Sequence, residues 1–158
     1  MEKVFEIVKI KQELVEKEGE RFIIRSPQDA VDCLTEEIGD EDREVLMVMM
    51  LNTKNEVIAL HRCHVGALDH SVVSSREIFK GAILNNSLNI ITLNITNIII
   101  SHNHPSSNPE ASPQDDDVTR KISKAGEVLG ITLLDHIIVT HSNKDFYSYK
   151  EHKPYLLK

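Results

Sequence analysis

The sequence predicts an α/β protein: a three-layer α-β-α sandwich with a mixed β-sheet between helices. Uninterrupted apolar runs at residues 45–51 and 98–100 are typical of strands that are buried on both faces. Segments with helical apolar spacing, at residues 26–38 and 114–129, are interleaved with these strands. The 158 residues, of which 41% are apolar, suffice for one domain with a substantial core.

Residues 1–20 are predicted to form an N-terminal amphipathic helix. Apolar side chains recur there near helical spacing, at Val4, Ile7, Val8, Leu14 and Val15, and Gly19 ends the pattern. The apolar stripe would pack either on the body of the domain or on a second copy, and the second alternative makes a homodimer.

The next segment reads as a short strand at 21–25, followed by a helix that Ser26 caps and that ends at Ile38. A charged turn then leads to a strand at 45–51. The turn Asn52–Asn55 connects it to a second strand at 56–65, which makes a hairpin.

In the second half we expect a helix at 75–84, a strand that ends at the two histidines His102 and His104, and a helix at 114–129. Buried strands at 131–134 and 137–140 and a last strand at 146–149 follow, with a frayed tail from Lys150, so residues 151–158 are assigned as a C-terminal tail. The segment 86–102 contains an approximate repeat, Leu88–Thr92 and Leu93–Thr96. It either lengthens the strand before His102 or adds an edge segment that could pair with another chain.

Two histidines stand at the end of the apolar run Ile98–Ile100, at His102 and His104, and Pro105 stops the strand because it cannot donate to a sheet ladder. Side chains two apart on a strand point the same way, so both imidazoles can reach one tetrahedral metal. Asp115 follows after a loop long enough to return a carboxylate to that point. Two histidines, one aspartate and an open fourth position are typical of a catalytic zinc site.

The spacing His-x-His, seven residues, Ser, two residues, Asp is met by His102, His104, Ser112 and Asp115. In this pattern the chain resembles the JAMM (MPN+) zinc metallopeptidases, and within them the RadC-like branch, whose His-Asn-His-Pro-Ser is also present. The resemblance covers about residues 26–150, including the flanking segments Leu51–Asn55 and Leu134–Val139. It implies a JAMM/MPN (cytidine deaminase-like) core, and we assign residues 21–150 to this domain.

The resemblance also implies roles for the site residues. Zn²⁺ would be held by His102, His104 and Asp115, and would lower the pKa of its water from about 16 toward 7. Glu44 stands where the family has its general base, with Glu41 and Asp42 as competitors nearby. Ser112 would donate a hydrogen bond to the oxyanion. The implied activity is hydrolysis of peptide or isopeptide bonds in a protein or peptide substrate. The family's glycine after Pro-Ser is replaced here by Ser107.

Plainer readings exist for several of these residues. Ser112–Asp115 also reads as a helix start, and the identical tetrapeptide occurs at Ser26–Asp29 with no histidines before it. His136 is either a residue that supports the metal ligands or a structural histidine. A second cluster, His61, Cys63 and His64, is read as ordinary strand residues, because the strand puts His64 on the opposite face from the other two.

Composition narrows the class of protein. No run is long enough to cross a membrane and no signal segment is present, so we expect a cytoplasmic protein. The formal charge of −7 without a basic block disfavours direct binding to nucleic acid. Two alternatives to the peptidase remain: a DNA-repair-associated role, which RadC-like proteins have long been given, and a non-catalytic protein-interaction scaffold, which the complete motif disfavours.

Overall fold

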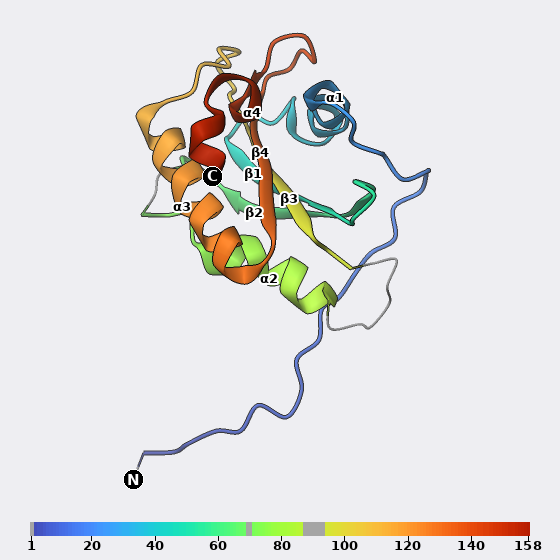
Figure 1. Cartoon of the computed structure of the whole chain (residues 1–158), viewed down its shortest axis with the longest axis vertical. Coiled ribbons are helices and arrows are strands. Elements are labelled where there is room, and N and C mark those ends of the chain that lie inside the picture. The colour runs from blue at the N-terminus through green and yellow to red at the C-terminus, as the bar shows by residue number, and fades with distance from the viewer. Residues whose placement is uncertain (1, 69–70, 87–93) are drawn as a thin grey trace.

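The computed structural model describes residues 2–68, 71–86 and 94–158 and contains one five-stranded sheet with helices on both faces (Figure 1). The strands are β1 (Val45–Leu51), β2 (Val57–Val65), β3 (Asn97–Asn103), β4 (Thr132–Val139) and β5 (Tyr147–Ser148). The helices are α1 (Pro27–Ile38), α2 (Ser75–Asn86), α3 (Pro113–Leu129), α4 (Tyr149–His152) and a final 3₁₀ helix at Pro154–Leu157.

The strand order in the sheet is β2-β1-β3-β4-β5. β1 pairs antiparallel with both β2 and β3, whereas β3 and β4 are parallel and β5 is antiparallel to β4. The sheet is therefore mixed, as predicted. A parallel pair needs a crossover, and α3 provides it, so α3 begins near the carboxyl end of β3.

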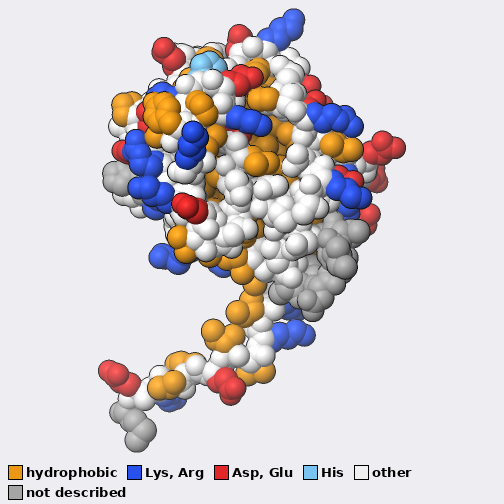
Figure 2. All heavy atoms as spheres, viewed as in Figure 1, with side chains coloured by type: hydrophobic (Ala, Val, Ile, Leu, Met, Phe, Trp, Pro, Cys, Tyr) orange, Lys and Arg blue, Asp and Glu red, His pale blue; other side chains and the backbone are white. Residues whose placement is uncertain are grey.

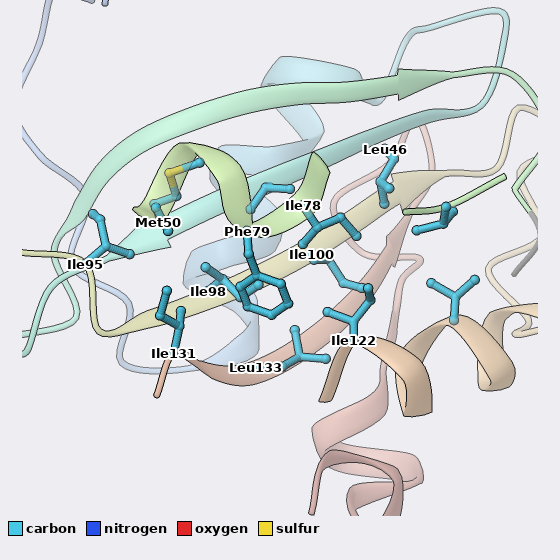
Figure 3. Close-up of a cluster of buried hydrophobic side chains, with 14 of the residues drawn as sticks. Leu46, Met50, Ile78, Phe79, Ile95, Ile98, Ile100, Ile122, Ile131 and Leu133 are labelled. Carbon is cyan, nitrogen blue, oxygen red and sulfur yellow. The ribbon is translucent and has the colours of Figure 1, made fainter. Parts of the chain in front are cut away.

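Alternate side chains of the central strands enter two separate cores. On one face, Leu46, Ile98, Ile100 and Leu133 pack with α2 and α3, around the fully buried Phe79 (Figure 3). On the other face, side chains of β1, β3 and β4 pack against α1. Burying one such large apolar side chain contributes about 1.5–3 kcal/mol. The predicted three-layer α-β-α arrangement is confirmed, and every residue of β1 is buried as its apolar run indicated.

Gly126 lets α3 pack closely against the turn that follows it and against α2. A Cβ atom at this position would lie 2.3 Å from the carbonyl oxygen of Ile131 and 3.2 Å from the ring of Phe79. Only glycine allows this contact without a shift of the backbone. The close approach helps to fix α3, whose first turn carries Asp115.

The predicted N-terminal helix is not formed. Residues 2–22 contain no helix or strand and lead away from the body, with apolar side chains exposed along them (Figures 1 and 2). Val4 and Val8 are 100% and 89% exposed. Helical spacing describes only a potential apolar face, and most of a helix's stability comes from packing that face against something. The strand expected at 21–25 is reduced to an isolated bridge between Ile23 and Glu56.

The C-terminal residues are ordered, contrary to the expected fraying. Ser148 caps α4, and the side chains of Tyr149 and Leu156 are buried in a small cluster with Ile138. Contact with β4 thus holds the tail in place. The two strands expected on either side of Asp135 and His136 form one continuous strand, β4, because both polar side chains are buried with hydrogen-bond partners.

Residues 87–93 lie outside the described part of the chain. The prediction that the repeat in 86–102 lengthens the strand or adds an edge segment falls largely on these residues. Of the last residues before β3, Ile95 is buried and exchanges hydrogen bonds with the side chain of Asn86. None of the helices in the described part of the chain has the length and apolarity that a bilayer span requires.

Candidate metal centre

The two histidines lie at the carboxyl end of β3 and point to the same face of the sheet. His102 is the penultimate residue of the strand and is fully buried, and His104 follows it, with its backbone N–H still bonded to Val139 at 2.9 Å. Strand alternation puts both rings on the side that α3 covers, as the sequence predicted.

Asp115 reaches the same point from the first turn of α3. Ser112 is the N-cap of this helix: its hydroxyl accepts from the backbone N–H of Asp115 at 3.2 Å. In return, Oδ2 of Asp115 accepts from the Ser112 backbone N–H at 2.8 Å. This capping box fixes the carboxylate, whose other oxygen, Oδ1, lies near His102.

The separations within this group suit a single ion. His102 Nε2 lies 3.0 Å from His104 Nε2 and 3.3 Å from Asp115 Oδ1, and His104 Nε2 lies 3.9 Å from Asp115 Oδ2. A tetrahedral zinc with bonds of about 2.0–2.1 Å separates its ligand atoms by about 3.3 Å. The three side chains form a group that could hold a metal ion.

Hydrogen bonds on the outer ring nitrogens decide which nitrogens face this point. Thr119 Oγ1 donates its one hydrogen to the backbone carbonyl of Asp115 at 2.7 Å, so toward His136 it can only accept. His136 Nδ1, at 2.6 Å, is therefore the donor to Thr119. The neutral His136 ring then accepts at Nε2 from His102 Nδ1 at 2.9 Å, which leaves His102 Nε2 with a lone pair.

His104 is oriented in the same way, since its Nδ1 donates to the carbonyl oxygen of Asn108 at 2.7 Å. The inner nitrogens of both rings and the Asp115 carboxylate thus present lone pairs to one another. Lone pairs facing at 3.0 Å repel unless a cation lies between them, so this donor set fits a bound metal ion.

Burial keeps the two fully buried histidines, His102 and His136, neutral. It lowers the pKa of His102 to about 4, although the neighbouring Asp115 carboxylate opposes this. Burial lowers the pKa of His136 well below its usual value, and charge on His102 or His104 would lower it further. Neutral imidazole is the form that binds metals, so near pH 7 His102 needs to lose no proton before metal binds.

Glu44, directly before β1, shares a pocket with two of the three ligands, His104 and Asp115. Glu44, His104, Ser112 and Asp115 are among the residues that line this pocket, together with Leu68, Pro105 and Ser106. Its Oε2 accepts from the backbone N–H of Leu68 at 3.1 Å. The competitor Glu41 instead pairs with Arg62 at 2.8 Å.

Asn103, which the sequence reasoning left unassigned, fixes the backbone on both sides of Glu44. Its side-chain oxygen accepts from the Val45 N–H at 2.7 Å, and its amide donates to the carbonyl of Arg43 at 2.8 Å. Its position between two histidines on a strand was the available signal: it must point to the opposite face of the sheet from them. The tripeptide His102–His104 therefore supplies two candidate ligands and, through Asn103, holds the backbone around Glu44.

The hydroxyl of Ser112 can cap the helix and still donate. Capping uses an oxygen lone pair, as acceptor from Asp115 N–H, and leaves the hydroxyl hydrogen available toward the pocket. At the twin position, the Ser26 hydroxyl lies 3.1 Å from Asp29 Oδ2 and donates to it. Both serines thus cap their helices, and Ser26 in addition donates to the aspartate of its own cap.

The loop that supplies Asn108 is held in an unusual conformation. Ser107 has a φ of 63°, in the left-handed region that favours glycine. Its hydroxyl lies 2.8 Å from Nδ1 of His141, which follows β4. The hydrogen bond anchors the loop to the sheet beside His104.

Residues 24–154 match the sequence profile of the RadC-like JAB domain. The chain belongs to this family. The match spans the whole sheet and every residue of the candidate centre, and the mixed five-stranded sheet with helices is consistent with a JAB/MPN fold.

Among curated relatives of this RadC-like JAB domain, a UPF0758 protein of Clostridium kluyveri is 44% identical over 135 residues, covering 85% of this chain and 55% of the relative. A UPF0758 protein of Caldanaerobacter subterraneus subsp. tengcongensis is 39% identical over 126 residues, covering 80% of this chain and 51% of the relative. The chain therefore spans about half the length of the curated relatives it matches.

Proposed function

We propose that this RadC-like domain is a zinc-dependent hydrolase of peptide or isopeptide bonds. The observation that carries the proposal is the pocket in which Glu44 and Ser112 face the same space as His104 and Asp115. Metal-assisted amide hydrolysis requires a general base, a hydrogen-bond donor to the carbonyl oxygen and a set of metal ligands. Glu44, Ser112 and the two lining ligands are groups of these kinds.

His102, His104 and Asp115 would hold the zinc, which when bound supplies Lewis-acid activation of water at neutral pH. The Glu44 carboxylate takes the proton from the attacking water and returns it to the leaving amine. Its hydrogen bond to the Leu68 N–H and the Asn103 contacts to its neighbours hold it at the pocket.

Ser112 donates its free hydrogen to the carbonyl oxygen as negative charge develops there. One such donor contributes on the order of 3 kcal/mol to lowering the barrier. Because the N-cap interaction fixes Oγ, the donor is oriented before the substrate arrives.

The test is a panel of peptide and isopeptide-linked substrates incubated with zinc-loaded protein. Wild type should cleave at least one of them and lose this activity on chelation. Glu44→Gln should retain zinc, because it removes no ligand, and should lose turnover. Equal cleavage by wild type and Glu44→Gln would refute the role of Glu44.

A DNA-associated role remains the alternative, and a salt-dependent gel shift separates it from hydrolysis. The formal charge of −7 is unfavourable for contact with phosphates. No retardation of duplex DNA at physiological ionic strength is therefore expected.

A further inference from the structure

The metal ligands are connected to each other behind the site. From His102 Nδ1 the chain of hydrogen bonds runs to His136 (2.9 Å), on to Thr119 (2.6 Å) and to the backbone carbonyl of Asp115 (2.7 Å). It thus begins on one ligand, passes through two buried side chains and ends on another ligand. We call His136 and Thr119 the relay.

We propose that the relay positions the metal site by selecting which nitrogen of His102 faces the metal. The proposal rests on the metal-binding part of the proposed function. Thr119 sets the direction, because its single hydrogen is committed to the Asp115 carbonyl and its oxygen can only accept from His136. That acceptor puts the hydrogen of His136 on Nδ1, and His136 in turn puts the hydrogen of His102 on its own Nδ1.

The ring of His136 is held against rotation. Tyr149, the first residue of α4, stacks on it with ring centroids 5.0 Å apart and an interplanar angle of 9°. The Tyr149 hydroxyl donates to Asp116 at 2.7 Å, so the stacked ring is itself tied to the first turn of α3. Turning the imidazole over would break the bonds to both Thr119 and His102.

A structural histidine and a threonine that bonds back to its own helix would explain the burial of both residues. Threonine in a helix often donates to the carbonyl four residues earlier. Such roles predict a loss of stability on substitution but no effect on the protonation pattern of His102. The relay predicts that a change at Thr119, which is not a ligand, alters the ring of His102.

Thr119→Val is the decisive variant because it keeps the shape and removes the acceptor. An N–H of His136 that faced the introduced methyl group would be buried without a partner, so the hydrogen of His136 should move to Nε2. His136 would then donate to His102 Nδ1, and the hydrogen of His102 should move to Nε2, toward the metal position. Thr119→Ser retains the oxygen and is the matched control.

Two measurements on the full chain test the relay without substrate. Ring ¹⁵N chemical shifts of the metal-free protein, assigned with a His102→Gln spectrum, report which nitrogen carries hydrogen. Competition with a chromophoric chelator gives the zinc affinity. Wild type and Thr119→Ser should carry hydrogen on Nδ1 of both His102 and His136. Thr119→Val should show Nε2–H on His102 and bind zinc about 10- to 100-fold more weakly.

The relay is refuted if wild type carries the hydrogen of His136 on Nε2, a result that needs no variant to fold. It is also refuted if Thr119→Val leaves the hydrogen of His102 on Nδ1 and the zinc affinity within about twofold of Thr119→Ser. Since neither readout involves turnover, failure of every cleavage assay would contradict the proposed hydrolase function alone.

Discussion

Substitution of Asp115 by alanine should separate metal binding from helix capping, because the chain contains its own control at Asp29. Both aspartates are the third residue of a helix, and both accept from the backbone N–H of a serine N-cap at 2.8 Å. Only Asp115 lies beside the two histidines, with Oδ1 at 3.3 Å from His102 Nε2. Asp29→Ala therefore loses a cap, whereas Asp115→Ala loses a cap and a ligand.

The magnitudes differ enough to be measured. Losing the capping carboxylate should lower the free energy of unfolding by about 1 kcal/mol or less in each variant. Free zinc at 100 times its Kd stabilises a folded protein that binds it by about 2.7 kcal/mol. For a chain of 158 residues, at about 2–4 °C per kcal/mol, this raises Tm by roughly 5–10 °C.

Thermal unfolding followed by circular dichroism, with and without zinc, together with metal analysis of the purified proteins, provides the assay. Wild type and Asp29→Ala should show the zinc-dependent rise in Tm, and Asp115→Ala should show about 1 °C or less. Asp115→Ala should still unfold cooperatively near the Tm of metal-free Asp29→Ala. Equal zinc content in wild type and Asp115→Ala would show that the ligand assignment is wrong.

Three further predictions concern particular contacts. Ser112→Ala should lower kcat by about 10²–10³-fold, while Ser26→Ala, which loses the same kind of cap, should leave kcat unchanged; equal kcat values would exclude Ser112 as a donor. Ser107 has a φ of 63°, so the Ser107→Gly variant should have a free energy of unfolding about 1 kcal/mol higher than the Ser107→Ala variant, measured by urea unfolding. The reverse order of the two variants would contradict backbone strain at this position. Burial raises the pKa of Asp135 from 3.8 to about 6, against opposing hydrogen bonds led by that from Ser148. Folding therefore favours its protonated form, and its contribution to stability is present below pH 4 and lost as pH rises through 6, by roughly 3 kcal/mol. The stability of wild type relative to Asp135→Asn should fall between pH 4 and 7, and parallel pH profiles would refute this.

The parts of the fold that the sequence predicted depend on local rules. Strand alternation alone puts His102 and His104 on one face, and a serine N-cap followed by proline starts α3 at the observed residue. The errors concern segments whose structure depends on distant contacts. The apolar side chains of residues 4–15 are exposed in an extended segment, and the C-terminal residues are ordered because Tyr149 and Leu156 reach Ile138.

The supporting residues of the site illustrate the same limit. Nothing in the neighbourhood of Thr119 along the chain indicates that its hydroxyl meets His136, because α3 and β4 come together only through the crossover between parallel strands. For His136 the sequence left a structural and a supporting role open, and the 2.9 Å contact with His102 favours the second. Asn103 was overlooked because its partners lie about sixty residues earlier in the chain.

The two identical tetrapeptides show what turns a helix cap into a candidate metal ligand. Ser26–Asp29 and Ser112–Asp115 have the same sequence and form the same reciprocal hydrogen bonds of a capping box. At α1 the hydroxyl of Ser26 donates its hydrogen to the carboxylate of Asp29. At α3 the parallel crossover from β3 to β4 puts the helix start at the strand end that carries His102 and His104. Chemistry at Asp115 therefore depends on topology, and moving the His-x-His motif away from β3 should leave an ordinary helix cap.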